Sequence, residues 1–158
     1  MLIHGIDPGT TESAIVTWDG VRVRYGVIME NEMLLSILRQ SDYTNGIVAI
    51  ESIASYGMAV GRETFETCEW CGRFREAAEN RKAKIVKVYR REVKIHYCGT
   101  MKAKDANVRQ ALIDKLGVVG TKAKPGPLHG IASHLWSALA VADYALTQQA
   151  QKDAQSKG

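Results

Sequence analysis

The 158-residue chain has few cysteines and no long apolar run. Its three cysteines cannot all pair within one chain, so the fold does not depend on a disulfide scaffold, and a reducing compartment is expected. No stretch approaches the roughly 20 apolar residues that a membrane span needs. The first residues lack the basic and apolar segments of a secretory signal. We therefore expect a cytoplasmic protein with no membrane partner.

The sequence also lacks internal repeats and any linker that would divide it. A chain of 158 residues can bury roughly two-thirds of its unfolded surface around one core. We therefore predict one domain over residues 1–150. Residues 151–158 are polar and have no apolar period, which predicts a flexible tail.

Apolar periodicity predicts strands and helices in a definite order. Three strands at 2–7, 13–18 and 21–28 form a meander, with a hairpin turn at Asp19-Gly20. The remaining segments are expected in this order: a helix near 31–40, a strand at 45–51, a helix at 63–82, a strand at 83–89, and helices at 105–117, capped by Asp105, and 130–149. The order predicts an α/β fold, a five-stranded mixed sheet flanked by helices.

Positive charge is concentrated in one part of the chain. The net charge is +4, and basic residues gather within about thirty positions, a pattern typical of phosphate binding. The alternative is a solvated strand edge and helix face. The cluster comprises Arg81, Lys82, Lys84, Lys87, Arg90, Arg91, Lys94, Lys102, Lys104 and Arg109.

Two apolar strands each end in an acid, Asp7 in "LIHGID" and Glu51 in "IVAIE". In an open α/β sheet the functional crevice lies beyond the carboxyl ends of the strands. If the two strands are parallel neighbours, these carboxylates converge and repel each other unless a cation lies between them. The alternative is that each acid is solvated independently.

Five motifs carry a family resemblance: "GIDPGTTESA", "VAIES", "VYRREVK", "KAKDANVRQAL" and "SHLWSALAVA". In this order and spacing they resemble the RuvC-type Holliday-junction resolvases, particularly their short phage-encoded relatives. The resemblance implies a ribonuclease H-like fold and a homodimer that acts on branched DNA, above all four-way junctions. It also implies two Mg²⁺ or Mn²⁺ ions per active site and paired nicks that leave 5′-phosphate and 3′-hydroxyl ends.

The same resemblance implies a metal-ligand set. Asp7 and Glu51 occupy the first two carboxylate positions of the family, and His134 and Ser137 occupy the last two. Residues three apart share one face of a helix, so the last two positions are compatible with one site. Serine departs from the family pattern, because its neutral hydroxyl is a weak metal ligand.

Further residues are assigned to catalysis and DNA binding. Lys94 lies where the family has a basic residue near the scissile phosphate, and Lys102 or Lys104 approximates a second one. The loop after Glu51 lies where relatives press a side chain against the junction centre; the alternative is a loop packed on its own domain. The predicted DNA-binding residues are Arg90, Arg91, Lys102, Lys104, Arg109, Ile53, Tyr56 and Met58.

Three other interpretations remain open. Ser137 is compatible with a junction-binding protein whose catalytic site has weakened. The "DPGTT" turn also resembles the phosphate-binding hairpin of actin-like and sugar-kinase ATPases, although the chain has no second copy of it. Cys68, Cys71, His96 and Cys98 are nominally four zinc ligands, but the CxxC pair within an amphipathic helix favours buried, uncharged thiols.

Overall fold

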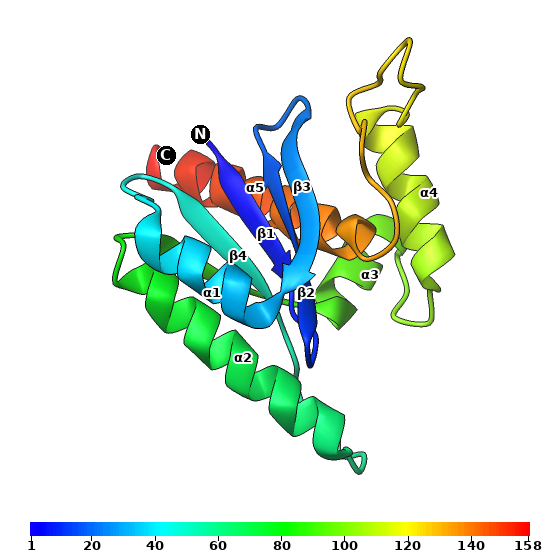
Figure 1. Cartoon of the computed structure of the whole chain (residues 1–158). Coiled ribbons are helices and arrows are strands. Elements are labelled where there is room, and N and C mark those ends of the chain that lie inside the picture. Colours follow the sequence, from blue (N-terminus) through cyan, green and yellow to red (C-terminus); the bar gives the residue numbers. More distant parts are fainter.

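The computed structural model describes all 158 residues. They form a twisted sheet with helices against both of its faces (Figure 1). The strands are β1 (Ile3–Asp7), β2 (Glu12–Trp18), β3 (Val23–Glu30), β4 (Ile47–Ser52) and β5 (Lys84–Tyr89). The helices are α1 (Asn31–Gln40), α2 (Arg62–Glu79), α3 (Arg90–Cys98), α4 (Asp105–Leu116) and α5 (Leu135–Ser156). No helix is long and apolar enough to cross a membrane.

The sheet order is β3-β2-β1-β4-β5. The first three strands are antiparallel neighbours, whereas β4 pairs in parallel with β1 and β5 pairs in parallel with β4. The predicted five-stranded mixed sheet is therefore confirmed. Because β1, β4 and β5 run in the same direction, their carboxyl ends meet at one edge of the sheet.

Alternate residues of the strands feed two separate cores. Ile6 and Ile50 pack with α1 and α2 on one face, while Ile3 and Ala49 pack with α5 and its neighbours on the other. This is the two-residue alternation expected of strands that are covered on both sides. Figure 1 shows α1 and α2 in front of the sheet and α5 behind it.

A glycine lets α5 lie directly on β1. A Cβ atom built on Gly5 would lie 2.1 Å from the carbonyl oxygen of Ala138 and 2.8 Å from the Cβ of Ala142. Backbone therefore meets backbone at this crossing. Because Gly5 lies two residues before Asp7 on the same face of the strand, the contact fixes the first turns of α5 beside Asp7.

We expect Gly5→Ala to lower the free energy of unfolding by about 3 kcal/mol, because the added methyl group overlaps backbone that cannot move without shifting the helix. Urea denaturation measures this loss. Gly72→Ala is the matched control, since a Cβ at Gly72 meets nothing within 4 Å. Equal effects of the two substitutions would contradict the close approach.

Three details differ from the elements expected from sequence. Helix α3 follows β5 directly and was not predicted. The N-cap of α4 is Lys104 rather than Asp105, because the side chain of Asn107 accepts a hydrogen bond from the Lys104 backbone N–H at 2.9 Å. Helix α5 continues through residues 151–156, whose side chains are exposed; the division of the chain at residue 150 stays a prediction.

Candidate functional site

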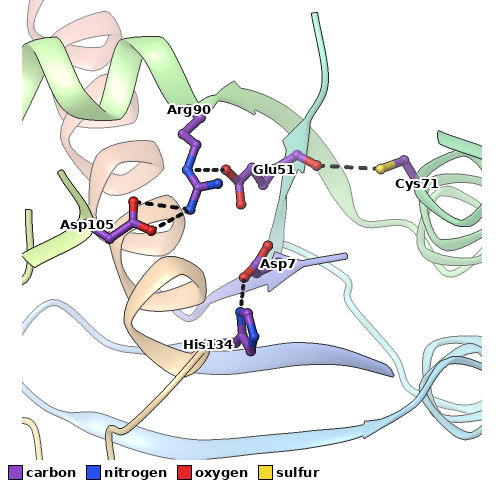
Figure 2. A network of polar contacts seen from close by, with 6 residues as sticks. All are labelled: Asp7, Glu51, Cys71, Arg90, Asp105 and His134. Carbon is purple, nitrogen blue, oxygen red and sulfur yellow. Dashed lines mark hydrogen bonds and ion pairs between the residues drawn. The ribbon is translucent and has the colours of Figure 1, made fainter. Parts of the chain in front are cut away.

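The two strand-end acids lie side by side. Ile6 of β1 pairs with Ile50 of β4, so the next residues, Asp7 and Glu51, occupy neighbouring positions of parallel strands. Both follow the alternation that turns Gly5 and Ala49 toward α5, so both carboxylates point to the same face (Figure 2). The two strands are therefore parallel neighbours, which is the condition under which the two acids were expected to converge.

The carboxylate pair is largely removed from water. The side chain of Asp7 is 15% exposed and that of Glu51 is 14% exposed. Burial raises the pKa of Asp7, although a hydrogen bond with Glu51 opposes this. Burial, followed by the hydrogen bond and the charge of Asp7, raises the pKa of Glu51 to about 8. Both acids therefore resist ionising at the same time. A bound cation would stabilise the pair when both carboxylates are ionised.

The start of α5 brings His134 and Ser137 to Asp7. The Nδ1 atom of His134 lies 3.5 Å from Oδ2 of Asp7, and the imidazole is 74% exposed. His134 is the N-cap of α5, and Ser137 lies in the first turn of the helix. A hydrogen bond from the Ser137 side chain lowers the pKa of Asp7. The two residues assigned by resemblance therefore both face Asp7; their roles as ligands stay predictions.

A buried polar network holds the turn after Asp7. The Gly9 N–H donates to Oγ of Ser13 at 3.1 Å, Ser13 donates to Asn31 at 2.5 Å, and the Asn31 amide donates to the Gly9 carbonyl at 2.9 Å. Ser13 is 2% exposed and Asn31 is 1% exposed. This network links the turn after β1 to β2 and α1 and fixes the backbone that follows Asp7. Sequence reasoning missed it, because no local pattern connects Asn31 with Gly9.

Arg90 and Asp105 also belong to the site. Arg90 begins α3, and its Nε lies 3.7 Å from Oε1 of Glu51. Its terminal nitrogen donates to both carboxylate oxygens of Asp105 at 3.2 Å (Figure 2). Asp105 begins α4. The sequence predicted Arg90 as a DNA contact and Asp105 only as a helix cap, whereas both lie beside Glu51.

The structure contains no group of three or more His, Cys, Asp or Glu side chains placed to hold a metal ion. The proposed zinc ligands are therefore not gathered into one site, and Cys68, Cys71 and Cys98 are free thiols. Cys71 instead donates to the backbone carbonyl of Glu51 at 3.6 Å, and burial raises the pKa of its thiol to about 11.

Comparison with solved structures identifies the fold. A structure of Thermus thermophilus RuvC aligns with a TM-score of 0.62 and 21% identity, covering 94% of this chain and 97% of that chain. A second, T. thermophilus RuvC in complex with a Holliday junction substrate, aligns with a TM-score of 0.63 and 23% identity, covering 92% of this chain and 94% of that one. The fold is that of RuvC. The predicted ribonuclease H-like fold is thereby confirmed.

Two other comparisons found nothing. No known protein-family model matches the chain, and no curated protein matches it. The likeness to RuvC is therefore a likeness of three-dimensional structure, and it covers nearly the whole chain.

Within this RuvC fold, Arg90 and two more of the predicted basic residues line a hollow with the site acids. Lys94 and Arg109 border the same depression as Glu51, Asp105 and Ser137. The guanidinium of Arg109 lies 4.9 Å from the centre of the Trp136 ring, which holds it against α5. A phosphate entering this hollow would meet positive charge within reach of the carboxylate pair.

The remaining predicted DNA contacts lie in the turn before α4, in the loop after β4 and at the start of α3. Lys102 and Lys104 are exposed in the turn before α4. The loop after β4 leaves Ile53, Tyr56 and Met58 exposed by 43%, 54% and 76%. Arg91 lies over the Tyr56 ring at 5.9 Å. Ile53 and Tyr56 border a second depression that reaches Asp7 and Glu51, so this loop adjoins the site.

Proposed function

We propose that this chain is a metal-dependent, structure-selective endonuclease that resolves four-way DNA junctions by paired nicks. The observation that carries the proposal is the partly buried pair of Asp7 and Glu51 at the carboxyl ends of parallel strands in a RuvC fold. The presence of a Holliday junction in the related T. thermophilus structure supports this substrate class. The proposal includes the phage-like branch and a cytoplasmic location.

The donor set fits a hard divalent cation. Asp7 and Glu51 offer carboxylate oxygens, which Mg²⁺ and Mn²⁺ prefer, and their mutual repulsion is what such a cation relieves. His134 supplies a nitrogen that favours Mn²⁺ over Mg²⁺, and Ser137 supplies a weaker oxygen. When bound, divalent cations activate water for attack on phosphorus and stabilise the departing 3′ oxygen.

The basic side chains have a separate task. Lys94 and Arg109 border the hollow beside Glu51 and are proposed to hold the scissile phosphate and to stabilise negative charge that develops on it. Lys102, Lys104 and Arg91 are exposed and are proposed to bind flanking phosphates. Exposed apolar side chains of the loop after β4, Tyr56 and Met58 among them, are proposed to contact the opened junction centre.

A two-fold symmetric homodimer would present two identical sites to a four-way junction, so that two strands are cut symmetrically. This arrangement is part of the proposal. Phe65 is 62% exposed at the start of α2 and is a candidate for the dimer contact, whereas Phe74 is fully buried in the core.

The deciding experiment incubates the protein with an end-labelled four-way junction and Mn²⁺ or Mg²⁺. We expect symmetric nicks whose products carry 5′-phosphate and 3′-hydroxyl ends and can be rejoined by DNA ligase. A linear duplex of the same sequence is the substrate control. Failure to cut any branched DNA with either ion would refute the proposal.

A junction-binding protein without nuclease activity is the second candidate. The neutral Ser137 and the lack of a third clustered metal-binding side chain favour it. In the same experiment it would retard the junction in a native gel without cutting it. An ATP titration separates both from an actin-like or sugar-kinase ATPase, which alone would bind the nucleotide.

His134→Ala is expected to reduce junction cleavage by about 10- to 100-fold while leaving the melting temperature unchanged, since the imidazole is exposed and contacts Asp7 only at 3.5 Å. His134→Asp is expected to retain activity and to shift the preference from Mn²⁺ toward Mg²⁺. Cleavage rates with each ion measure both effects. His129→Ala, in the loop before α5, is the control, and wild-type rates for His134→Ala would remove His134 from the site.

A further inference from the structure

Arg90 occupies the centre of the candidate site. It borders three depressions, which it shares with Lys94, Ile53 and His134 respectively. Its place follows from the sheet, because Glu51 pairs with Val88 of β5, and Arg90 comes two residues later at the start of α3. A permanent cation is therefore built in next to the carboxylates that are proposed to hold a divalent cation.

The two acids that contact Arg90 hold it unequally. The guanidinium donates to both oxygens of Asp105 at 3.2 Å, but its nearest approach to Glu51 is 3.7 Å, which is an ion pair without a hydrogen bond. The carboxylates of Asp7 and Glu51 are 15% and 14% exposed, so negative charge on this pair is less screened by water than charge on Asp105 and attracts a cation more strongly. Asp105 is 74% exposed and nevertheless makes the closer contact.

We infer that Asp105 is a positioning residue that holds Arg90 back from Glu51 and so keeps the Glu51 oxygens open for a divalent cation. Without Asp105, nothing else directs the guanidinium away, and it would settle on the carboxylate pair and compete with the metal. Arg90 is 54% exposed, so it has the freedom to make this movement. The inference rests on the proposed metal-dependent function.

A double-mutant cycle tests the inference through Mn²⁺ binding rather than cleavage. Calorimetry measures the Mn²⁺ affinity of the wild type, Asp105→Asn, Arg90→Gln and the double variant, at pH 8 and physiological salt, where long-range charge effects are screened beyond about 8 Å. We expect Asp105→Asn to weaken binding about tenfold, and the same substitution to cost less than about twofold when Arg90 is already Gln. Arg39→Gln on α1 is the matched control for loss of an exposed arginine, and it should bind Mn²⁺ as the wild type does.

Equal losses in both backgrounds would overturn the inference, because Asp105 would then act on the metal directly. No loss in either background would overturn it as well. Both substitutions remove exposed side chains, so circular dichroism should report folded proteins. A wild type that binds no Mn²⁺ would refute the inference together with the proposed function. A coupled cycle in a protein that cuts no junction would uphold the inference and refute only the nuclease.

Discussion

Asp7→Asn is expected to abolish junction cleavage, by at least about a thousandfold, while leaving junction affinity unchanged or increased. The substitution keeps the size of the side chain and its capacity for hydrogen bonds, but removes the charge of one of the two carboxylates proposed to hold the metal. It also removes a negative charge that repels the DNA phosphates. Rate and affinity should therefore change in opposite directions, or the rate alone should change.

Single-turnover cleavage and native-gel titration of one labelled junction measure the two quantities. Asp153→Asn, near the exposed end of α5, is the control for the loss of one negative charge. Cleavage by Asp7→Asn at the normal rate would exclude Asp7 from the site. Loss of binding together with cleavage would instead indicate a folding defect, which the melting temperature would reveal.

Much of the fold could be predicted because strands and long amphipathic helices leave a periodic signal. Helix α3 was missed because it is short, most of its side chains are charged or polar, and only Val93 is buried. Its arginines and lysine indicate a basic cluster, which carries no information about helix formation. Its helical form depends on its position after β5 and on a capping interaction, in which the Glu92 side chain accepts from the Tyr89 N–H at 3.0 Å.

The two strand-end acids were predictable, whereas the site roles of Asp105, Asn31 and Ser13 were not. Asp7 and Glu51 each interrupt an apolar strand end, so the cost of burying them marks them in the sequence. Asp105 lies in a charged segment where an acid is unremarkable, and only the packing of α4 beside α3 brings it to Arg90. Asn31 and Ser13 are similar, because their network joins residues far apart in the chain.

Helix α5 also places no acid beside Asp7, although a metal site made only of carboxylates would need one there. Asp143, the acid nearest to Ser137 on this helix, is 4% exposed and points away from Asp7. Lys115 of α4 donates to its Oδ2 at 2.6 Å, and the Tyr97 hydroxyl donates at 2.5 Å. Asp143 therefore joins α3, α4 and α5 to one another. This is consistent with its spacing of nine residues from His134, which predicts the opposite helix face.

The metal-free protein is expected to lose stability as pH rises from about 5 to about 8, because Glu51 must then ionise beside Asp7. The folded-state pKa of Glu51 is raised from 4.5 to about 8. Between these values the unfolded chain has released its proton and the folded chain retains it, so the slope of stability against pH is negative. The expected loss is on the order of a few kcal/mol. Mg²⁺ or Mn²⁺ should restore stability at pH 8 more than at pH 5.

Thermal melts in chelator, with and without added cation, measure this effect. Glu51→Gln is the key comparison, since it removes the titrating group, and its melting temperature should vary less with pH and respond less to Mg²⁺. Comparing the two proteins also removes the contribution of His4 to the pH dependence of stability. Burial lowers the pKa of His4, which gives a slope of the opposite sign. Asp19, whose pKa is lowered to about 2, loses its stabilising contribution only in stronger acid and stays outside this window. If wild type and Glu51→Gln follow the same pH curve in chelator, the pKa of Glu51 is not raised, and if Mg²⁺ also stabilises both proteins equally, Glu51 does not hold the cation.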